Sequence, residues 1–221
     1  IENMKRLIAG YQDFRKTRWP REKARYEEAA KGQKPEYLII ACSDSRSDPA
    51  TIFGAHPGEF FLVRNIAALV PEQDATNGVY GTRAAIAYAV LALKVRNIVV
   101  MGHASCGGIK AYATDFEPLS NSNYIGDWVS LVEPASKTLE AEGDSIDKPG
   151  YLTRLEYASI GQSLKNLLTF DFVRERVESG ELMLHGAHFG IEKGELLIRD
   201  PETGEFNPVA DGNGKPFKQS D

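Results

Sequence analysis

Two cysteines and one histidine are the residues of this sequence best suited to hold a metal ion. Cys42 opens the segment "CSDSR", and His103 and Cys106 lie together in "HASCGG". Two thiolates and one imidazole form a ligand set of catalytic zinc sites, in which the fourth position stays open. The His-x-x-Cys spacing lets one loop supply two ligands, and the following glycines let the backbone approach closely. These residues predict a zinc site, provided that the fold brings the two segments together.

Short apolar runs precede both segments and predict the strands that would position them. Residues 37–41 directly precede Cys42, residues 97–102 directly precede His103, and residues 60–63 form a third run. Short continuous apolar runs are typical of buried parallel strands. Ligand sites of parallel sheets lie at the carboxyl ends of the strands. If the strands at 37–41 and 97–102 are neighbours, the three candidate ligands converge.

The stretches between and after these strands predict helices and two further strands. Residues 78–94 are alanine-rich and apolar almost all round, which predicts a largely buried helix. Helical patterns follow near 126–141 and over 151–178, and residues 181–206 indicate two strands joined at Lys193-Gly194, with a turn at 201–204. The alternation of strands and helices predicts an α/β fold with a mostly parallel central sheet flanked by helices.

The two ends of the chain differ from this central part. Residues 1–32 are charged and favour helices, with a break at Pro20 and a stop at Gly32. Aromatic residues give the segment an apolar side, as in a helical arm that packs on another surface such as a second subunit. Residues 208–221 are polar and glycine-rich, which predicts a loose tail. We therefore expect one domain over residues 1–221.

Composition and charge exclude several classes of protein. The 221 residues are 42% hydrophobic and 26% charged, as is usual for a soluble globular protein. The net charge of −5 argues against a broad nucleic-acid surface, and no apolar run approaches the roughly 20 residues of a membrane helix. Two cysteines do not make a disulfide framework and favour a reducing compartment, so we expect a cytoplasmic protein without nucleic-acid or membrane partners.

The motifs resemble, in order and spacing, those of the β-class carbonic anhydrases. Besides "CSDSR" and "HxxCGG", the matching segments are "HPGEFFLVRNIAALVP" (56–71), "GTRAAIAYAVLALKVRNIVVMGHASCGGIKA" (81–111), "DWV" (127–129) and "LHG" (184–186). The resemblance spans roughly residues 30–205. It implies a zinc lyase that hydrates CO₂ reversibly to bicarbonate and a proton through zinc-bound hydroxide. It also implies a homodimer, or a dimer-based tetramer or larger assembly.

The resemblance assigns roles to the residues around the metal. Cys42, His103 and Cys106 would bind one Zn²⁺ per chain. Asp44 would accept a hydrogen bond from the zinc-bound oxygen, and Arg46 would pair with Asp44.

The resemblance also assigns residues to substrate binding. Gln33 matches a glutamine that reaches the active site across a dimer interface and donates to the substrate oxygen. The backbone N–H of Gly107 would be a second donor. Phe61, Ile66 and Tyr88 fall where the plant-like branch of the family lines its CO₂ pocket.

One position distinguishes the branches of the family. Ile39 stands where one branch has a tryptophan that belongs to an inhibitory bicarbonate-binding site. With Ile39 there and Gln33 present, we expect the plant-like branch, without that inhibitory site.

Two other functions fit the same residues. Hydrolysis of carbonyl sulfide or carbon disulfide uses the same attack on a linear molecule, and access to the pocket would decide between the substrates. A non-catalytic zinc-binding regulatory protein is a further alternative, but Asp44 and Arg46 beside the ligands argue against it, because a structural zinc site fills its fourth position with a protein ligand. His56, His185 and His188 have no metal-ligand spacing to a cysteine and are expected to be structural or surface residues. Arg64 would brace either the site or a dimer.

Overall fold

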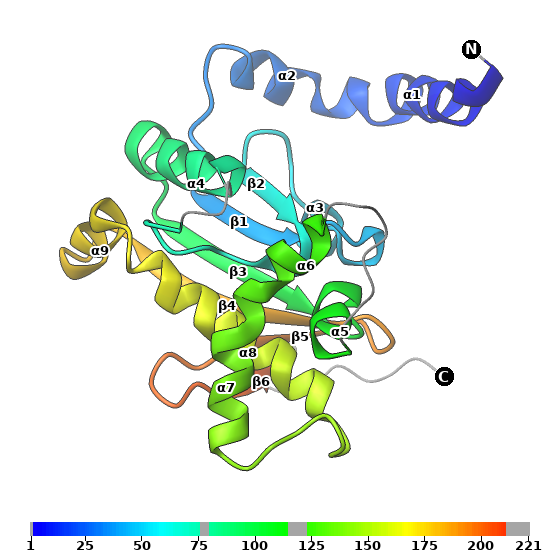
Figure 1. Ribbon diagram of the computed structural model, residues 1–221. Helices are drawn as coiled ribbons and strands as arrows, with labels where there is room; N and C mark the ends of the chain where they lie inside the picture. The colour runs from blue at the N-terminus through cyan, green and yellow to red at the C-terminus, as the bar shows by residue number, and fades with distance from the viewer. Residues whose placement is uncertain (1, 76–79, 115–122, 211–221) are drawn as a thin grey trace.

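The strands form a single sheet within the part of the chain that the computed structural model describes, residues 2–75, 80–114 and 123–210 (Figure 1). Its order is β2-β1-β3-β4-β5-β6. The strands are β1 (Tyr37–Cys42), β2 (Phe60–Asn65), β3 (Asn97–His103), β4 (Met183–Gly190), β5 (Glu195–Arg199) and β6 (Phe206–Pro208). The pairs among β2, β1, β3 and β4 are parallel, and β5 and β6 are added antiparallel. The sheet is mixed but mostly parallel, as predicted; β6 was not expected.

The register of the two central strands brings the metal-binding segments to one edge. β1 and β3 are neighbours, and Ala41 pairs with Met101. Cys42 therefore lies beside the last residues of β3, and the loops that carry "CSDSR" and "HASCGG" leave the sheet at the same carboxyl edge. The predicted adjacency of these strands is confirmed.

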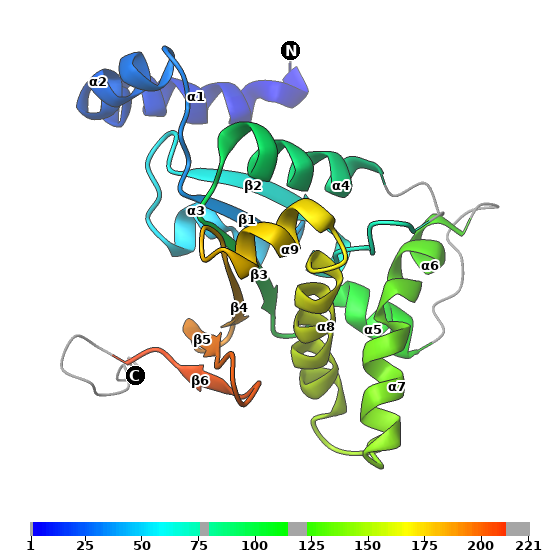
Figure 2. The same cartoon turned by 90° about the vertical axis from the view of Figure 1, so that its left-hand side faces the viewer.

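Both faces of β1 are buried, which explains its continuous apolar sequence. Leu38 and Ile40 pack on the face covered by α4 (Tyr80–Ala87), α8 (Tyr151–Leu167) and α9 (Asp171–Glu178), as Figure 2 shows. Ile39 and Ala41 point to the opposite face, where α3 (Pro49–Ile52) contributes Ile52.

Further helices gather at the carboxyl edge of the sheet. They are α5 (Gly107–Ala113), α6 (Tyr124–Val129) and α7 (Glu133–Ala141). A separate apolar cluster lies among them and includes the two cysteines together with Ile109, Val132 and Leu155. The metal-binding segments thus rest on a packed core and not on a surface loop.

Two predicted helices differ from the expectation. α4 continues as a π-helical turn, Tyr88–Leu93, whose outer side is uncovered: Tyr88 is 52% exposed and Leu91 is 55% exposed. The expectation of a largely buried helix was therefore wrong for this side. The stretch 151–178 forms two helices, because Phe170 has an extended backbone and anchors its ring in the core at 3% exposure, which turns the chain.

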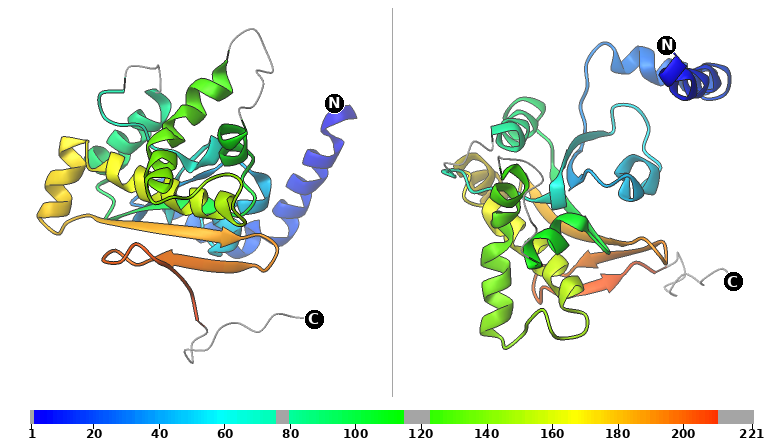
Figure 3. Two further views of the ribbon diagram at one scale, coloured as in Figure 1. Left: turned by 60° about the horizontal axis from the view of Figure 1, so that its bottom comes forward. Right: turned by 45° about the vertical axis from the view of Figure 1, so that its right-hand side comes forward.

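The N-terminal arm consists of helices α1 (Lys5–Thr17) and α2 (Trp19–Ala29). They meet at Arg18, and Pro20 occupies the first turn of α2, so the predicted break is confirmed. Figures 1 and 3 show the arm standing apart from the sheet, and no residue of α1 is buried. Residues 211–221 of the predicted tail lie outside the described residues. Across the described ranges, we find no helix that is long and apolar enough to cross a membrane.

Candidate metal centre

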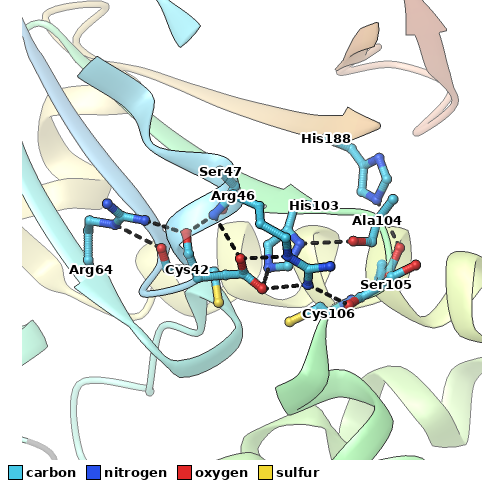
Figure 4. A network of polar contacts seen from close by, with 11 residues as sticks. Cys42, Arg46, Ser47, Arg64, His103, Ala104, Ser105, Cys106 and His188 are labelled. Atoms are coloured by element: carbon cyan, nitrogen blue, oxygen red, sulfur yellow. Dashed lines mark hydrogen bonds and ion pairs between the residues drawn. The ribbon is translucent and has the colours of Figure 1, made fainter. Parts of the chain in front are cut away.

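Cys42, His103 and Cys106 converge as the sequence predicts. The ligand atoms of the three side chains all lie within 4.8 Å of one another, and all three residues are buried. Figure 4 shows them side by side, Cys42 and His103 at the ends of β1 and β3 and Cys106 just before α5. Their exposed fractions are 5%, 1% and 4%. This arrangement has the residue types and the proximity of a three-ligand metal site.

The His103 ring is oriented as a metal ligand. Its Nδ1 lies 3.0 Å from the carbonyl oxygen of Ala104 and, because a carbonyl can only accept, Nδ1 carries the proton. The other ring nitrogen, Nε2, then offers a lone pair. This atom is buried and has no hydrogen-bond partner among the described residues. A buried, unsatisfied nitrogen beside two sulfur atoms fits a Zn²⁺ ligand.

Peptide groups surround the two sulfur atoms and favour their thiolate forms. The Cys42 sulfur accepts from the backbone N–H groups of Asp44 and Ala67, and the Cys106 sulfur accepts from those of Gly108 and Ile109. The Cys106 thiol also donates to the Cys42 sulfur, which lowers the pKa of Cys42 to about 4 and raises the pKa of Cys106. A lowered pKa of Cys42 favours its thiolate, the form in which cysteine binds a metal ion.

A strained turn brings one of these N–H groups to Cys42. Ala67 and Ala68 follow β2 with φ angles of 64° and 55°, in the left-handed region that alanine rarely adopts. The side chain of Asn65 holds the turn, because its Nδ2 donates to the carbonyl oxygen of Leu69 and its Oδ1 accepts from the N–H of Leu69. The strain is thus maintained by specific contacts beside the metal site.

Gly108 is required by the close packing of α5 on this turn. A Cβ at position 108 would lie 2.7 Å from Cγ2 of Ile66 and 2.9 Å from Cβ of Ala67. Any side chain would push the start of α5, and with it Cys106, away from Cys42. The second glycine of "CGG" therefore has a packing role at the site.

Asp44 and Arg46 form the ion pair expected from the sequence. Arg46 donates from Nε to Oδ1 of Asp44 at 2.9 Å and from Nη2 to Oδ2 at 2.7 Å. Its backbone N–H also donates to Oδ1 at 2.9 Å. These contacts hold the pKa of Asp44 well below its usual range. Oδ2 of Asp44 lies 3.8 Å from Nε2 of His103, so an ionised carboxylate faces the metal ligands.

Arg64 braces the loop that carries this carboxylate. It donates to the carbonyl oxygens of Cys42 at 2.9 Å and Asp44 at 2.6 Å, and its Nη1 reaches Oδ1 of Asp48 at 3.0 Å. Of the two roles that the sequence left open for Arg64, these contacts support bracing of the site.

The proposed substrate-binding residues divide into two groups. Gly107 begins α5 directly after Cys106, and Ile66 contacts α5 at Gly108, so both lie next to the ligands. Gln33 precedes β1 and so lies at the amino end of the strand that carries Cys42 at its carboxyl end.

Phe61 and Tyr88 form the distant group together with Gln33. Phe61 pairs with Leu38, four residues before Cys42, a distance of about 13 Å along a strand. The Tyr88 ring lies against Phe61, with 5.7 Å between the ring centroids. A single chain therefore does not bring Gln33, Phe61 or Tyr88 to the metal ligands.

One polar contact to the ligand loop could not be predicted from the sequence. The buried carboxylate of Glu156, on α8, accepts from the backbone N–H of Cys106 at 3.0 Å and pairs with Nε2 of His188 at 2.9 Å. Glu156 stands 50 residues from Cys106 and is part of no motif, so only the fold reveals the contact.

Comparison with known proteins connects these features to one group of enzymes. The family described as "Carbonic anhydrase" matches residues 37–196. "Beta carbonic anhydrase 3" of Arabidopsis thaliana is 34% identical over 196 residues, which cover 88% of this chain and 76% of that protein. The structure of the β-carbonic anhydrase CcaA superposes with a TM-score of 0.87 at 32% identity, covering 94% of this chain and all of that one. A structure from a study of two tetrameric β-carbonic anhydrases of Sordaria macrospora gives a TM-score of 0.77 at 27% identity, over 94% of this chain and 100% of that one.

Proposed function

The chain belongs to the β-carbonic anhydrase family, and from this premise we propose that it catalyses the reversible hydration of CO₂ to bicarbonate and a proton. The observation that carries the proposal is the buried cluster of Cys42, His103 and Cys106 with an ionised Asp44 beside it. These enzymes use zinc, and the donor set fits that metal with one ion per chain. We treat residues 1–221 as one functional unit in this reaction.

The ligands have a defined task in the proposed reaction. Bound zinc supplies hydroxide at neutral pH, because it lowers the pKa of a water molecule. The two thiolates and the imidazole leave one position open to solvent and substrate. Peptide N–H groups donate to both sulfurs and so reduce the negative charge that the thiolates place on the metal ion. The ion would then remain a stronger Lewis acid and lower the pKa of a water molecule further.

Asp44 would orient the attacking hydroxide in this scheme. Because Arg46 keeps its carboxylate ionised, Oδ2 of Asp44 can only accept a hydrogen bond. The proton of the hydroxide would therefore be directed to Oδ2, and an oxygen lone pair of the hydroxide would remain free to attack the carbon of CO₂ and give bicarbonate. Arg46, with its two side-chain contacts, fixes the position of that acceptor.

A second copy of the chain would complete the substrate side of the site. Gln33, Phe61 and Tyr88 lie too far along the sheet to reach the ligands of their own chain, and Tyr88 is 52% exposed. We propose that they line the site of a neighbouring subunit, where Gln33 and the Gly107 N–H donate to the oxygen that becomes negative. The tetrameric state named for the Sordaria enzymes supports a homo-oligomer.

We propose further that the enzyme belongs to the plant-like branch and lacks the inhibitory bicarbonate site. Ile39 is 2% exposed and packs with Ala41, Met101 and Ala187 in an apolar cluster. Asp44 is paired with Arg46, as an active site open to water requires.

The test is stopped-flow CO₂ hydration between pH 7 and 9 on protein of known zinc content. We expect the rate to rise in proportion to bound zinc. Asp44→Asn should keep the zinc but lose about 100-fold or more of the rate, because the amide can donate a proton and no longer enforces the orientation. Protein with full zinc and negligible hydration would contradict the proposed function.

A further inference from the structure

We propose that Glu156 is a positioning residue for the metal site, which holds Cys106 in place through the peptide N–H of that cysteine. The inference rests on the zinc-binding part of the proposed function and not on the reaction. It assigns to the buried pair of Glu156 and His188 a role that neither residue type nor spacing in the sequence indicates.

Both carboxylate oxygens of Glu156 are in use. Oε1 accepts from the Cys106 N–H at 3.0 Å, and Oε2 lies 2.9 Å from Nε2 of His188. Glu156 is 4% exposed and His188 is 2% exposed, so no solvent competes for these contacts. Burying a carboxylate destabilises the folded protein unless its oxygens accept hydrogen bonds. One of the two hydrogen-bond partners of Glu156 is the backbone of a metal ligand.

The loop before α5 depends on few anchors. The Ala104 N–H donates to the carbonyl oxygen of Phe189 at 2.9 Å, and Nη2 of Arg46 reaches the carbonyl oxygen of Ser105 at 3.4 Å. Ser105 itself has a φ of 56°, a conformation that only surrounding contacts maintain. Glu156 holds the peptide N–H of Cys106 with its side chain.

The fold brings α8 close enough for this contact at Gly102. A Cβ at position 102 would lie 2.8 Å from Cδ1 of Ile160, so the absence of a side chain lets α8 lie directly on β3. His188, on β4, is oriented by Glu156 on one side and by the Tyr157 ring on the other, at 4.8 Å between centroids and 85° between planes. Its Nδ1 has no partner within the described part of the chain, so Glu156 supplies the ring's hydrogen bond.

A purely structural pair would behave differently from a positioning pair, and the same sheet offers a matched control. Asn97, at the start of β3, is 5% exposed, and its Oδ1 lies 3.0 Å from Nε2 of His185 on β4. This is also a buried hydrogen bond to a histidine of β4, but at the opposite end of the sheet from the ligands. Asn97→Ala should lower the melting temperature without changing zinc affinity.

The experiment measures zinc affinity by competition with a chromophoric chelator, together with the thiolate-to-metal absorption band of the Co²⁺-loaded protein. We expect Glu156→Ala to weaken zinc binding about 10–100-fold and to change the Co²⁺ band. Glu156→Gln should bind within a few-fold of the original protein, since its amide oxygen still accepts from the Cys106 N–H. Neither measurement uses CO₂, so the result stands whether or not hydration is observed.

Two outcomes would overturn the inference. One is a Glu156→Ala protein that melts at a lower temperature, as Asn97→Ala does, but binds zinc with unchanged affinity and an unchanged Co²⁺ band. The other is a Glu156→Gln protein as weak in zinc binding as Glu156→Ala, because the charge and not the hydrogen-bond acceptor would then be responsible. If Glu156→Ala does not fold, His188→Ala and His188→Gln replace it. His188→Ala should weaken zinc binding. His188→Gln, whose amide can still donate to Oε2 of Glu156, should bind zinc more tightly than His188→Ala. Equal zinc affinities of the two variants would refute the role of His188.

Discussion

The two ends of strand β1 differ in how much of their surroundings one chain supplies. At the carboxyl end, Cys42 meets His103 and Cys106, and the helices α5 and α8 close the site from behind. At the amino end, Gln33 lies in an open hollow between the arm and the sheet. The chain thus assembles the whole ligand cluster from its own residues, whereas under our proposal a second copy would complete the substrate side.

The contacts at the two ends also differ in kind. The metal end is held by hydrogen bonds between side chains and the backbone, partly buried for Arg64 and fully buried for Glu156. The arm is held to the body by partly exposed contacts: Glu22 with His56 at 3.1 Å, Arg18 with the Ala55 carbonyl at 3.3 Å, and Arg25 with Glu59 at 3.7 Å. Exposed pairs of this kind contribute little to stability. We therefore expect substitutions at the first end to change metal binding and those at the second to change assembly and substrate binding.

The largest effect is expected from removing a ligand. Cys106→Ala should abolish stoichiometric zinc binding and reduce CO₂ hydration by at least about 1,000-fold, because two remaining ligands do not hold a catalytic ion. Metal analysis and stopped-flow kinetics measure both quantities. His185→Ala is the control, because His185 of β4 hydrogen-bonds with Asn97 and not with the ligands. This variant should bind zinc normally. Loss of zinc from it would show that metal binding depends on residues at the opposite end of the sheet.

A mixing experiment tests the other end. Gln33→Ala should keep zinc but lose about 100-fold in CO₂ hydration, the usual effect of removing one oxyanion donor. If Gln33 serves a neighbouring site, co-expression of Gln33→Ala with Cys106→Ala should restore activity well above that of either parent. A mixed dimer would hold one zinc site that receives an intact Gln33 from the other chain. Activity that stays at the sum of the two parents would show that Gln33 does not act across an interface.

Much of the metal end could be predicted from the sequence because its determinants are local. Cys42, Asp44 and Arg46 follow one apolar run, His103 and Cys106 follow another, and parallel pairing of the two strands is sufficient to bring them together. Glu156 escaped prediction because its contact to Cys106 joins residues that are 50 apart and depends on the close approach of α8 to β3 at Gly102. No periodicity or motif in the sequence encodes that approach.

The other end was harder to predict for a different physical reason. The apolar pattern of residues 78–94 indicated a buried helix, yet the structure of one chain exposes Tyr88 and Leu91. A hydrophobic pattern records burial in the complete assembly and does not say whether the covering surface belongs to the same chain. The break of the expected helix 151–178 at Phe170 likewise depends on where one ring finds a place in the core.

The attachment of the arm should depend on pH. Hydrogen bonding from Arg18, opposed by burial and supported by the hydrogen bond with His56 of the body, lowers the pKa of Glu22 below the ordinary value of 4.5. A carboxyl group whose pKa is lowered by folding stabilises the folded form above its ordinary pKa, and this contribution is lost as the pH falls through the lowered value. Hydrogen exchange of α2 peptides should therefore be slower in the original protein than in Glu22→Gln at pH 7. The difference should shrink as the pH falls below 4.5 and vanish once the pH is below the lowered pKa of Glu22; a difference independent of pH would exclude the ionised Glu22 as its cause.

The smallest effect is expected at Lys94, which ends the π-helical turn just before β3 with φ of 56° and ψ of 44°. This left-handed conformation is unfavourable for lysine and open to glycine, which is the usual residue at such a helix end. Lys94 is exposed and lies on the side of the sheet away from the ligands, so little packing is lost. Lys94→Gly should raise the free energy of unfolding by about 0.5–1 kcal/mol, the relief of backbone strain less the added flexibility of the unfolded chain. Calorimetry should show a melting temperature about 1–4 °C higher, and chelator competition should show an unchanged zinc affinity. A weaker zinc affinity would mean that this turn influences the metal ligands, and the two ends of the strands would then not be independent.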